Sequence, residues 1–115
     1  MRKLLLICVA TFLQLLSFAQ DTAHFKASFY HKKFEGRKTA NGDVYREDSM
    51  TAASNYYKLG TKVLVINLKT GERVVVRIND RTHAKMKSRI DLSKAAFKKI
   101  AEVKKGVISV KTTEL

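Results

Sequence analysis

Residues 62–79, which read KVLVINLKTGERVVVRIN, decide the fold of this chain. Lys62 to Leu68 alternates apolar and polar residues around β-branched positions, a pattern typical of a strand. Lys69 to Glu72 predicts a turn in which Gly71 is free to take a positive φ. Arg73 to Asn79 predicts a second strand, whose start is too apolar to leave one face in water. The segment therefore predicts a hairpin with its second strand in the core.

One helix is predicted further along, over Asp91 to Val103 (DLSKAAFKKIAEV). Ser93 is placed to cap it, lysines at its end suit the negative pole of the helix dipole, and Gly106 follows as a terminator. Short strands are expected at Ala27–Tyr30 (ASFY) and Val107–Lys111 (VISVK). Strands near both ends, with one helix before the last, predict a small closed barrel. The apolar residues that share one helix face are Leu92, Ala96, Ile100 and Val103.

Residues 1–19 have the pattern of a secretory signal peptide. A basic start and an apolar run from Leu4 to Leu16 precede small residues and a cleavage position after Ala19. The alternative is a transmembrane anchor, but the run is shorter than the roughly 20 residues that span a bilayer. A lipid anchor is not expected, because Cys8 lies too early. We therefore expect an exported protein, periplasmic or extracellular, whose residues 20–115 form one domain.

The charge of the chain is strongly positive: 23 Lys and Arg stand against 10 Asp and Glu. Inside a cell this balance would favour a nucleic-acid partner. Outside the inner membrane, the available polyanions are anionic lipids, lipopolysaccharide and the carboxylates of peptidoglycan. We therefore expect no nucleic-acid partner, no stable membrane insertion once the leader is removed, and a monomer. Solubility alone is the other interpretation of the charge.

Two carboxylates stand out as candidates for acid–base chemistry. Asp80 directly follows the most apolar strand, so its backbone is held rigidly at the rim of the barrel, as catalysis requires. Asp43 follows the turn signal Asn41-Gly42. Each also has a structural interpretation, Asp80 in a turn stabilised by Arg81 and Asp43 as a turn residue. Asp91 is expected to be structural, either capping the helix or pairing with a neighbouring arginine.

Other kinds of site find no support in the sequence. The histidines at positions 24, 31 and 83 lack the spacing of metal ligands, so no metal is expected. The serines have no nucleophile motif around them, and no glycine-rich phosphate loop is present. We expect no cofactor.

Several ordered blocks of the chain resemble a known family, the RlpA-like (rare lipoprotein A) double-psi β-barrel domain, which is related to the barrels of expansins. The resemblance runs from Ala27 to Val110. It implies a mainly β fold, a small six-stranded double-psi β-barrel with one short α-helix near the C-terminus. The blocks that carry it are ASFY, KKFEGRKTANGDVY, MTAAS, LGTKVLVINLKTGERVVVRINDR and RIDLSKAAFKKIA.

The resemblance also implies an activity, that of a lytic transglycosylase acting on peptidoglycan glycan strands. In this reaction the 6-hydroxyl of muramic acid closes onto its own anomeric carbon, so no water is used and an anhydro end remains. One carboxyl group can protonate the leaving oxygen and then accept the proton of the attacking hydroxyl. The family's aspartate in its Asn-Asp-Arg motif falls on Asp80, and its glutamate after Asn-Gly falls on Asp43. These two residues are the implied catalytic pair.

The chain departs from the family pattern around the implied cleft. The family's histidine after Thr-Ala-Ala falls on Ser54, and its Gly-Pro after Asn-Asp-Arg falls on Thr82-His83. His83 is a candidate replacement for the histidine. A non-catalytic peptidoglycan-binding or wall-loosening barrel is therefore the alternative function. Substrate contacts are expected at Tyr30, Tyr45, Ser54, Arg81 and His83, and Tyr56 and Tyr57 are further candidates for stacking on sugars.

Overall fold

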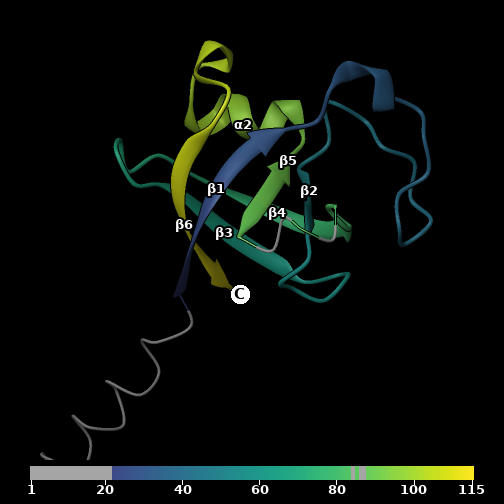
Figure 1. The fold of residues 1–115 in the computed structure, drawn as a ribbon, viewed down its shortest axis with the longest axis horizontal. Coiled ribbons are helices and arrows are strands. Elements are labelled where there is room, and N and C mark those ends of the chain that lie inside the picture. The colour runs from purple at the N-terminus through teal and green to yellow at the C-terminus, as the bar shows by residue number, and fades with distance from the viewer. Residues whose placement is uncertain (1–21, 84, 86–87) are drawn as a thin grey trace, which may run out of the picture.

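Six strands close into a barrel in the computed structural model, which describes residues 22–83, 85 and 88–115 (Figure 1). The expected leader, residues 1–19, lies outside the described residues. The strands are β1 (Thr22–Phe29), β2 (Thr51–Ser54), β3 (Lys62–Asn67), β4 (Arg73–Asp80), β5 (Arg89–Leu92) and β6 (Ile108–Glu114). The helical elements are α2 (Lys94–Ile100) and the short 3₁₀ turns η1 (Lys32–Phe34) and η2 (Val103–Lys105).

The strands follow the order β1-β5-β2-β4-β3-β6 around the barrel, and β6 pairs with β1 to close it. Two pairs are parallel, β1 with β5 and β2 with β4, and the other four are antiparallel. The parallel pairs require long crossovers, which the segments after β1 and β2 supply. The predicted closed barrel with one short helix is confirmed.

The predicted hairpin is confirmed as β3 and β4, which pair antiparallel from Lys62 opposite Arg77 to Ile66 opposite Arg73. Gly71 in the connecting turn has a φ of 79°, the left-handed conformation expected of it. The expectation that the second strand has no face in water is wrong. Its residues alternate, and Val75 keeps 45% of its surface exposed, because the outside of this part of the barrel faces solvent.

The helix is shorter than predicted. Leu92 belongs to β5, where it pairs with β2, and the chain is extended again at Ala101, so the helix spans only Lys94–Ile100. Ser93 caps it as predicted, because its hydroxyl accepts a hydrogen bond from the Ala96 amide. The strands β2 and β5, four residues each, have no predicted counterpart from periodicity.

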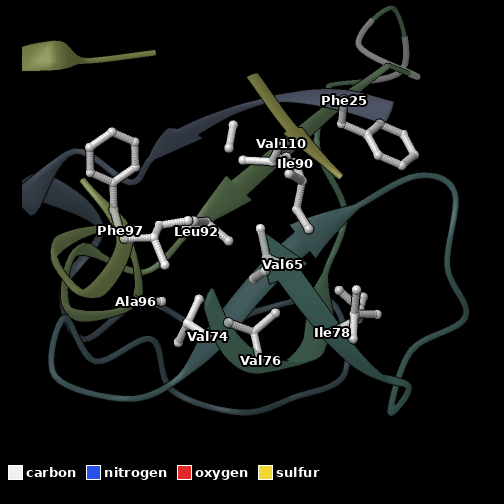
Figure 2. Close-up of a cluster of buried hydrophobic side chains, with 14 of the residues drawn as sticks. Phe25, Val65, Val74, Val76, Ile78, Ile90, Leu92, Ala96, Phe97 and Val110 are labelled. Atoms are coloured by element: carbon white, nitrogen blue, oxygen red, sulfur yellow. The ribbon is translucent and has the colours of Figure 1, made fainter. Parts of the chain in front are cut away.

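The barrel interior is filled by aliphatic side chains from all six strands, and α2 closes one end with Ala96, Phe97 and Ile100 (Figure 2). All six strands of the closed barrel lie within residues 22–114. In the part of the chain that is described, no helix is long and apolar enough to span a membrane. The fully or nearly buried strand residues include Ala27, Ala52, Val63, Val65, Val76, Ile78, Ile90, Leu92 and Val110.

Candidate active site

Asp80 is the last residue of β4 and lies half-buried at the rim, as predicted from its place after an apolar strand. Its carboxylate accepts three hydrogen bonds. Oδ2 accepts from the Tyr30 hydroxyl at 2.6 Å, and Oδ1 accepts from the amides of Ala40 and Arg81, each at 2.9 Å. These donors come from three separate segments of the chain, so both oxygens are held in a fixed orientation.

Tyr30 reaches Asp80 from the end of β1 and is supported by aromatic packing. Its ring stacks on that of Tyr45 with centroids 4.3 Å apart and planes 12° apart, and Phe34 meets it edge-on. Burial, and then the hydrogen bond to Asp80, raise the pKa of Tyr30 well above its ordinary value. The Tyr30 side chain is therefore a neutral donor at physiological pH. Tyr45, predicted to contact substrate, is 1% exposed and supports Tyr30 from behind.

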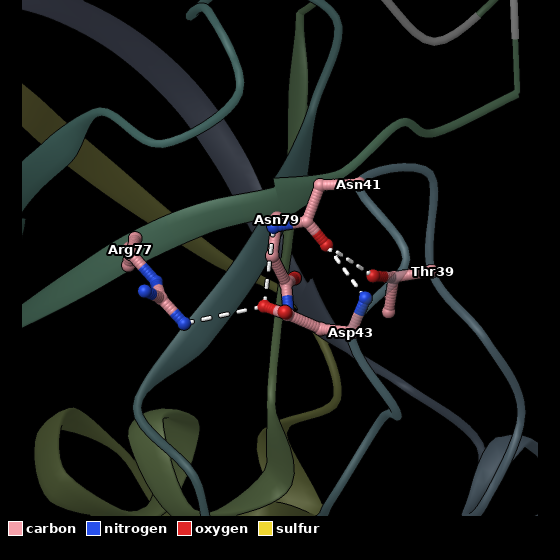
Figure 3. Close-up of polar contacts among 5 residues, drawn as sticks. All are labelled: Thr39, Asn41, Asp43, Arg77 and Asn79. Atoms are coloured by element: carbon pink, nitrogen blue, oxygen red, sulfur yellow. Dashed lines mark hydrogen bonds and ion pairs between the residues drawn. The ribbon is translucent and has the colours of Figure 1, made fainter.

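Asp43 lies in a separate polar cluster, shown in Figure 3. Its Oδ2 accepts from Asn41 Nδ2 at 3.1 Å, from Arg77 Nη2 at 3.2 Å and from Asn79 Nδ2 at 3.4 Å. Thr39 completes the turn, because its hydroxyl donates to Asn41 Oδ1 at 2.8 Å. Both Asp43 and Arg77 remain substantially exposed, so this ion pair faces solvent.

One loop links the two carboxylates. Asp80 holds the amide of Ala40, and the next amide, that of Asn41, donates to the Asn79 carbonyl at 3.2 Å. Asp43 follows in the same loop, and its carboxylate contacts β4 by accepting hydrogen bonds from Asn79 and Arg77. A cleft of about 560 Å³ opens in front of Asp43. Among the described residues, its lining includes Asn79 but not Asp80, and consists of Asp43, Val44, Ser49, Met50, Thr51, Lys62, Arg77 and Asn79.

Ser54 ends β2 beside Asp80, because Ala53 is paired with Asp80 across the parallel strands. It is 1% exposed, and its hydroxyl accepts from the amides of Tyr56 and Tyr57 at 3.0 and 3.3 Å. This side chain therefore stabilises a turn. Arg81 reinforces the same turn, since its guanidinium donates to the carbonyls of Ser54, at 2.7 Å, and Tyr57.

The residues after Arg81 are held by Asn55, which the sequence analysis did not single out. Its Oδ1 accepts from the Thr82 amide at 3.1 Å, and its Nδ2 donates to the His83 carbonyl at 2.9 Å. The imidazole of His83 is exposed, and its Nδ1 accepts from the Lys85 amide. Asn55 thus fixes the segment that carries the candidate histidine. No sequence motif marks this role.

The two other tyrosines differ in exposure. Tyr57 is 6% exposed, and its hydroxyl shares a 2.6 Å hydrogen bond with Thr112 inside the barrel. Tyr56 is 64% exposed, and its ring is held edge-on by Phe25 and Tyr57. Tyr56 is therefore an accessible aromatic surface. The structure also brings no group of three or more potential metal-ligating side chains together among its described residues.

Sequence comparison identifies close relatives. A sequence profile of the lytic transglycolase family matches residues 22–112. The endolytic peptidoglycan transglycosylases RlpA of Haemophilus influenzae and Pasteurella multocida are 46% and 51% identical over 89 and 81 residues. These matches cover 77% and 70% of this chain, but 31% and 28% of those proteins. The chain thus spans about a third of their length. An uncharacterized Synechocystis protein is 46% identical over 89 residues, 77% of this chain and 94% of that protein.

Two solved structures share the fold. The Streptomyces papain inhibitor superimposes with a TM-score of 0.69 at 22% identity, covering 84% of this chain and 96% of the inhibitor. The apo structure of the Clavibacter michiganensis expansin superimposes with a TM-score of 0.65 at 25% identity, covering 82% of this chain and 50% of the expansin. The predicted double-psi β-barrel is confirmed.

Proposed function

Since this chain belongs to the lytic transglycolase family, we propose that it cleaves peptidoglycan glycan strands without water, as an RlpA-type endolytic transglycosylase. The observation that carries the proposal is the Asp80 carboxylate, held at the barrel rim by Tyr30 and by two backbone amides. The names of the RlpA relatives, at 46% and 51% identity, support the same activity. The proposed location is outside the inner membrane, periplasmic or extracellular, after cleavage of residues 1–19.

Asp80 is the proposed acid and base. In its protonated form it donates a proton to the glycosidic oxygen, and the bond from that oxygen to the anomeric carbon of muramic acid breaks. The muramic 6-hydroxyl then bonds to the anomeric carbon and returns its proton to Asp80, so no proton is gained or lost overall. Fixed geometry supports this role, because one group must reach both oxygens in turn.

Asp43 is proposed to assist by electrostatics. Its carboxylate lines the cleft, and the donors Asn41, Asn79 and Arg77 hold it as an acceptor. A fixed negative charge of this kind stabilises the positive charge that develops on the sugar as the glycosidic bond breaks. Retention of a carboxylate at this position, one methylene shorter than the family's glutamate, is consistent with that role.

The proposed substrate contacts divide by exposure. Arg81 and His83 follow Asp80 closely in the chain and are exposed, so we propose that they contact the glycan directly. Tyr30 is half-buried, and we propose that it positions Asp80. Tyr45 and Ser54 are each 1% exposed. Their proposed roles are therefore indirect: Tyr45 supports Tyr30, and Ser54 supports the turn at Tyr56 and Tyr57.

The direct test is digestion of purified sacculi followed by mass analysis of the products. Wild-type protein is expected to release glycan fragments with anhydro-muramic ends, and Asp80→Asn is expected to release none. Asp48→Asn, the same chemical change at an exposed aspartate outside the site, serves as the control and keeps full activity. A folded wild-type protein that yields no anhydro ends from either intact or peptide-stripped glycan would contradict the proposed activity.

A second candidate function, glycan binding without cleavage, is favoured by one specific observation. Ser54 occupies the position of the family's histidine, and a serine hydroxyl, here buried and accepting from two turn amides, cannot exchange a proton at neutral pH as an imidazole does. In that case the protein sediments with sacculi and releases no fragments, and binding survives Asp80→Asn. Weakening of this binding by salt would show that the basic surface contributes.

A further inference from the structure

Four neighbouring strands, β4, β3, β6 and β1, present one outer surface of the barrel, which meets the cleft of the candidate site at Lys62 and Arg77. Their outward positions follow from the alternation of buried and exposed residues along each strand. Two chemical types dominate these positions, cations and aliphatic side chains. We call this surface the basic-aliphatic face, and define it by Lys26, Lys62, Leu64, Ile66, Leu68, Arg73, Val75, Arg77 and Lys111.

The register of β3 and β4 places a cation opposite a cation at one position and an aliphatic residue opposite another at the next outward position. Lys62 is directly opposite Arg77, and Leu64 is directly opposite Val75. Ile66 lies between Arg73 on one side and Lys111 on the other. Directly opposed cations destabilise a sheet unless an anion lies near them. Asp43 supplies one such anion to Arg77, at the edge of the face.

The rest of the face is not neutralised. At outward positions of residues 22–26, 62–66, 73–77 and 109–113, no Asp or Glu occurs. Carboxylates appear only beyond these positions, at Glu72 and Glu114. The aliphatic side chains are also accessible, since Val75 is 45% exposed and Leu68 is 49% exposed. The face therefore combines exposed aliphatic side chains with positive charge that nearby carboxylates do not neutralise.

We propose that the basic-aliphatic face binds the surface of a bilayer that contains anionic phospholipid. Lysine and arginine near such a surface are attracted to its headgroups, and aliphatic side chains between them enter the interfacial region. An acidic protein partner is the less suitable occupant. Protein interfaces are enriched in aromatic residues and depleted in lysine, whereas the nine residues of this face include three lysines and no aromatic residue. The bound protein would lie peripherally on the bilayer, without inserting a helix.

The test is co-sedimentation of residues 20–115 with vesicles at low salt. This fragment contains the whole closed barrel and excludes the apolar leader, which would bind lipid by itself. Vesicles of phosphatidylglycerol with phosphatidylcholine are expected to bind it, and vesicles of phosphatidylcholine alone are not. Arg73→Gln with Lys111→Gln is expected to weaken partitioning by roughly thirtyfold, since each cation contributes about fivefold. Leu68→Ser with Val75→Ser is expected to weaken it several-fold without changing the charge.

The control is Lys32→Gln with Lys33→Gln, which removes the same charge from η1, outside the four strands. It is expected to weaken binding much less than the change on the basic-aliphatic face. Equal losses in the two double variants would overturn the proposal, because net charge alone would then explain binding. So would failure of wild-type protein to bind anionic vesicles. A third outcome would also overturn the proposal. If Arg73→Gln with Lys111→Gln still binds vesicles but no longer binds polyglutamate, the face is a site for an acidic protein partner.

Discussion

The hydroxyl of Tyr30 donates a 2.6 Å hydrogen bond to Oδ2 of Asp80, joining the end of β1 to the end of β4 across 50 positions of sequence. The contact ties the proposed acid to the aromatic stack of Tyr30 on Tyr45. The position of the carboxyl group thus depends on packing as well as on backbone amides.

Tyr30→Phe is expected to lower kcat by about tenfold and to leave KM nearly unchanged, because it removes one hydrogen bond that orients the acid. Phenylalanine keeps the stacking on Tyr45, so the loss of stability should be that of one hydrogen bond, about 1 kcal/mol. Release of anhydro ends from sacculi, measured at several substrate concentrations, gives both parameters. Tyr56→Phe, at an exposed tyrosine, is the matched control. A rise in KM with unchanged kcat would contradict a positioning role for Tyr30.

Stability is expected to fall in alkali. Burial raises the pKa values of both Tyr30 and Tyr45, so the folded barrel favours their neutral phenols. In the unfolded chain these phenols ionise near pH 10, so their contribution is complete below about pH 10 and is lost as the pH rises further. Thermal melts between about pH 9 and pH 11 should show this loss. Tyr30→Phe should reduce the loss of melting temperature per pH unit. An unchanged loss would contradict the attribution of this pH dependence to Tyr30.

Asn55→Ala is expected to loosen the segment after Arg81, because it removes the hydrogen bonds to Thr82 and His83. Each bond contributes about 1 kcal/mol to stability. Limited trypsin digestion should therefore cleave faster after Lys85. Asn55→Asp keeps the acceptor for the Thr82 amide but not the donor to His83, so its cleavage rate should be intermediate. Identical digestion of all three proteins would show that Asn55 does not hold this segment.

Arg77→Gln is expected to weaken substrate binding while lowering the free energy of unfolding only slightly. The Arg77–Asp43 ion pair is substantially exposed, so its loss should cost at most about 1 kcal/mol of unfolding free energy. Removal of a cation from the cleft should, however, raise KM for a glycan that carries carboxylates. Chemical denaturation and the sacculus assay measure the two effects. A large loss of stability with unchanged KM would mean that Arg77 is structural.

The hairpin, the capped helix and the positions of both carboxylates were predictable because each rests on a local pattern. Asp80 follows the most apolar predicted strand, and Asp43 follows Asn41-Gly42. The partners of these residues were not predictable. Tyr30 and Asp80 meet only because β1 and β4 end at the same rim, and no local pattern encodes that meeting.

The errors have similar causes. Strand β2 shows no alternation, because all four of its residues are buried. Val75 was expected in the core, but a barrel strand has an outer face that sequence hydrophobicity alone does not reveal. Ser54 and Tyr45 were expected to contact substrate, and the structure buries both. Substrate contact at these two residues has not been tested and stays a prediction.

The pairing of β1 with β6 also has a consequence for the timing of folding. The Thr112 hydroxyl donates to the Ala23 carbonyl, 89 positions earlier, so the first strand gains its antiparallel partner only when the last strand is available. Contacts this distant in sequence form slowly. A chain emerging from the ribosome N-terminus first therefore cannot close its barrel until β6 has been synthesised.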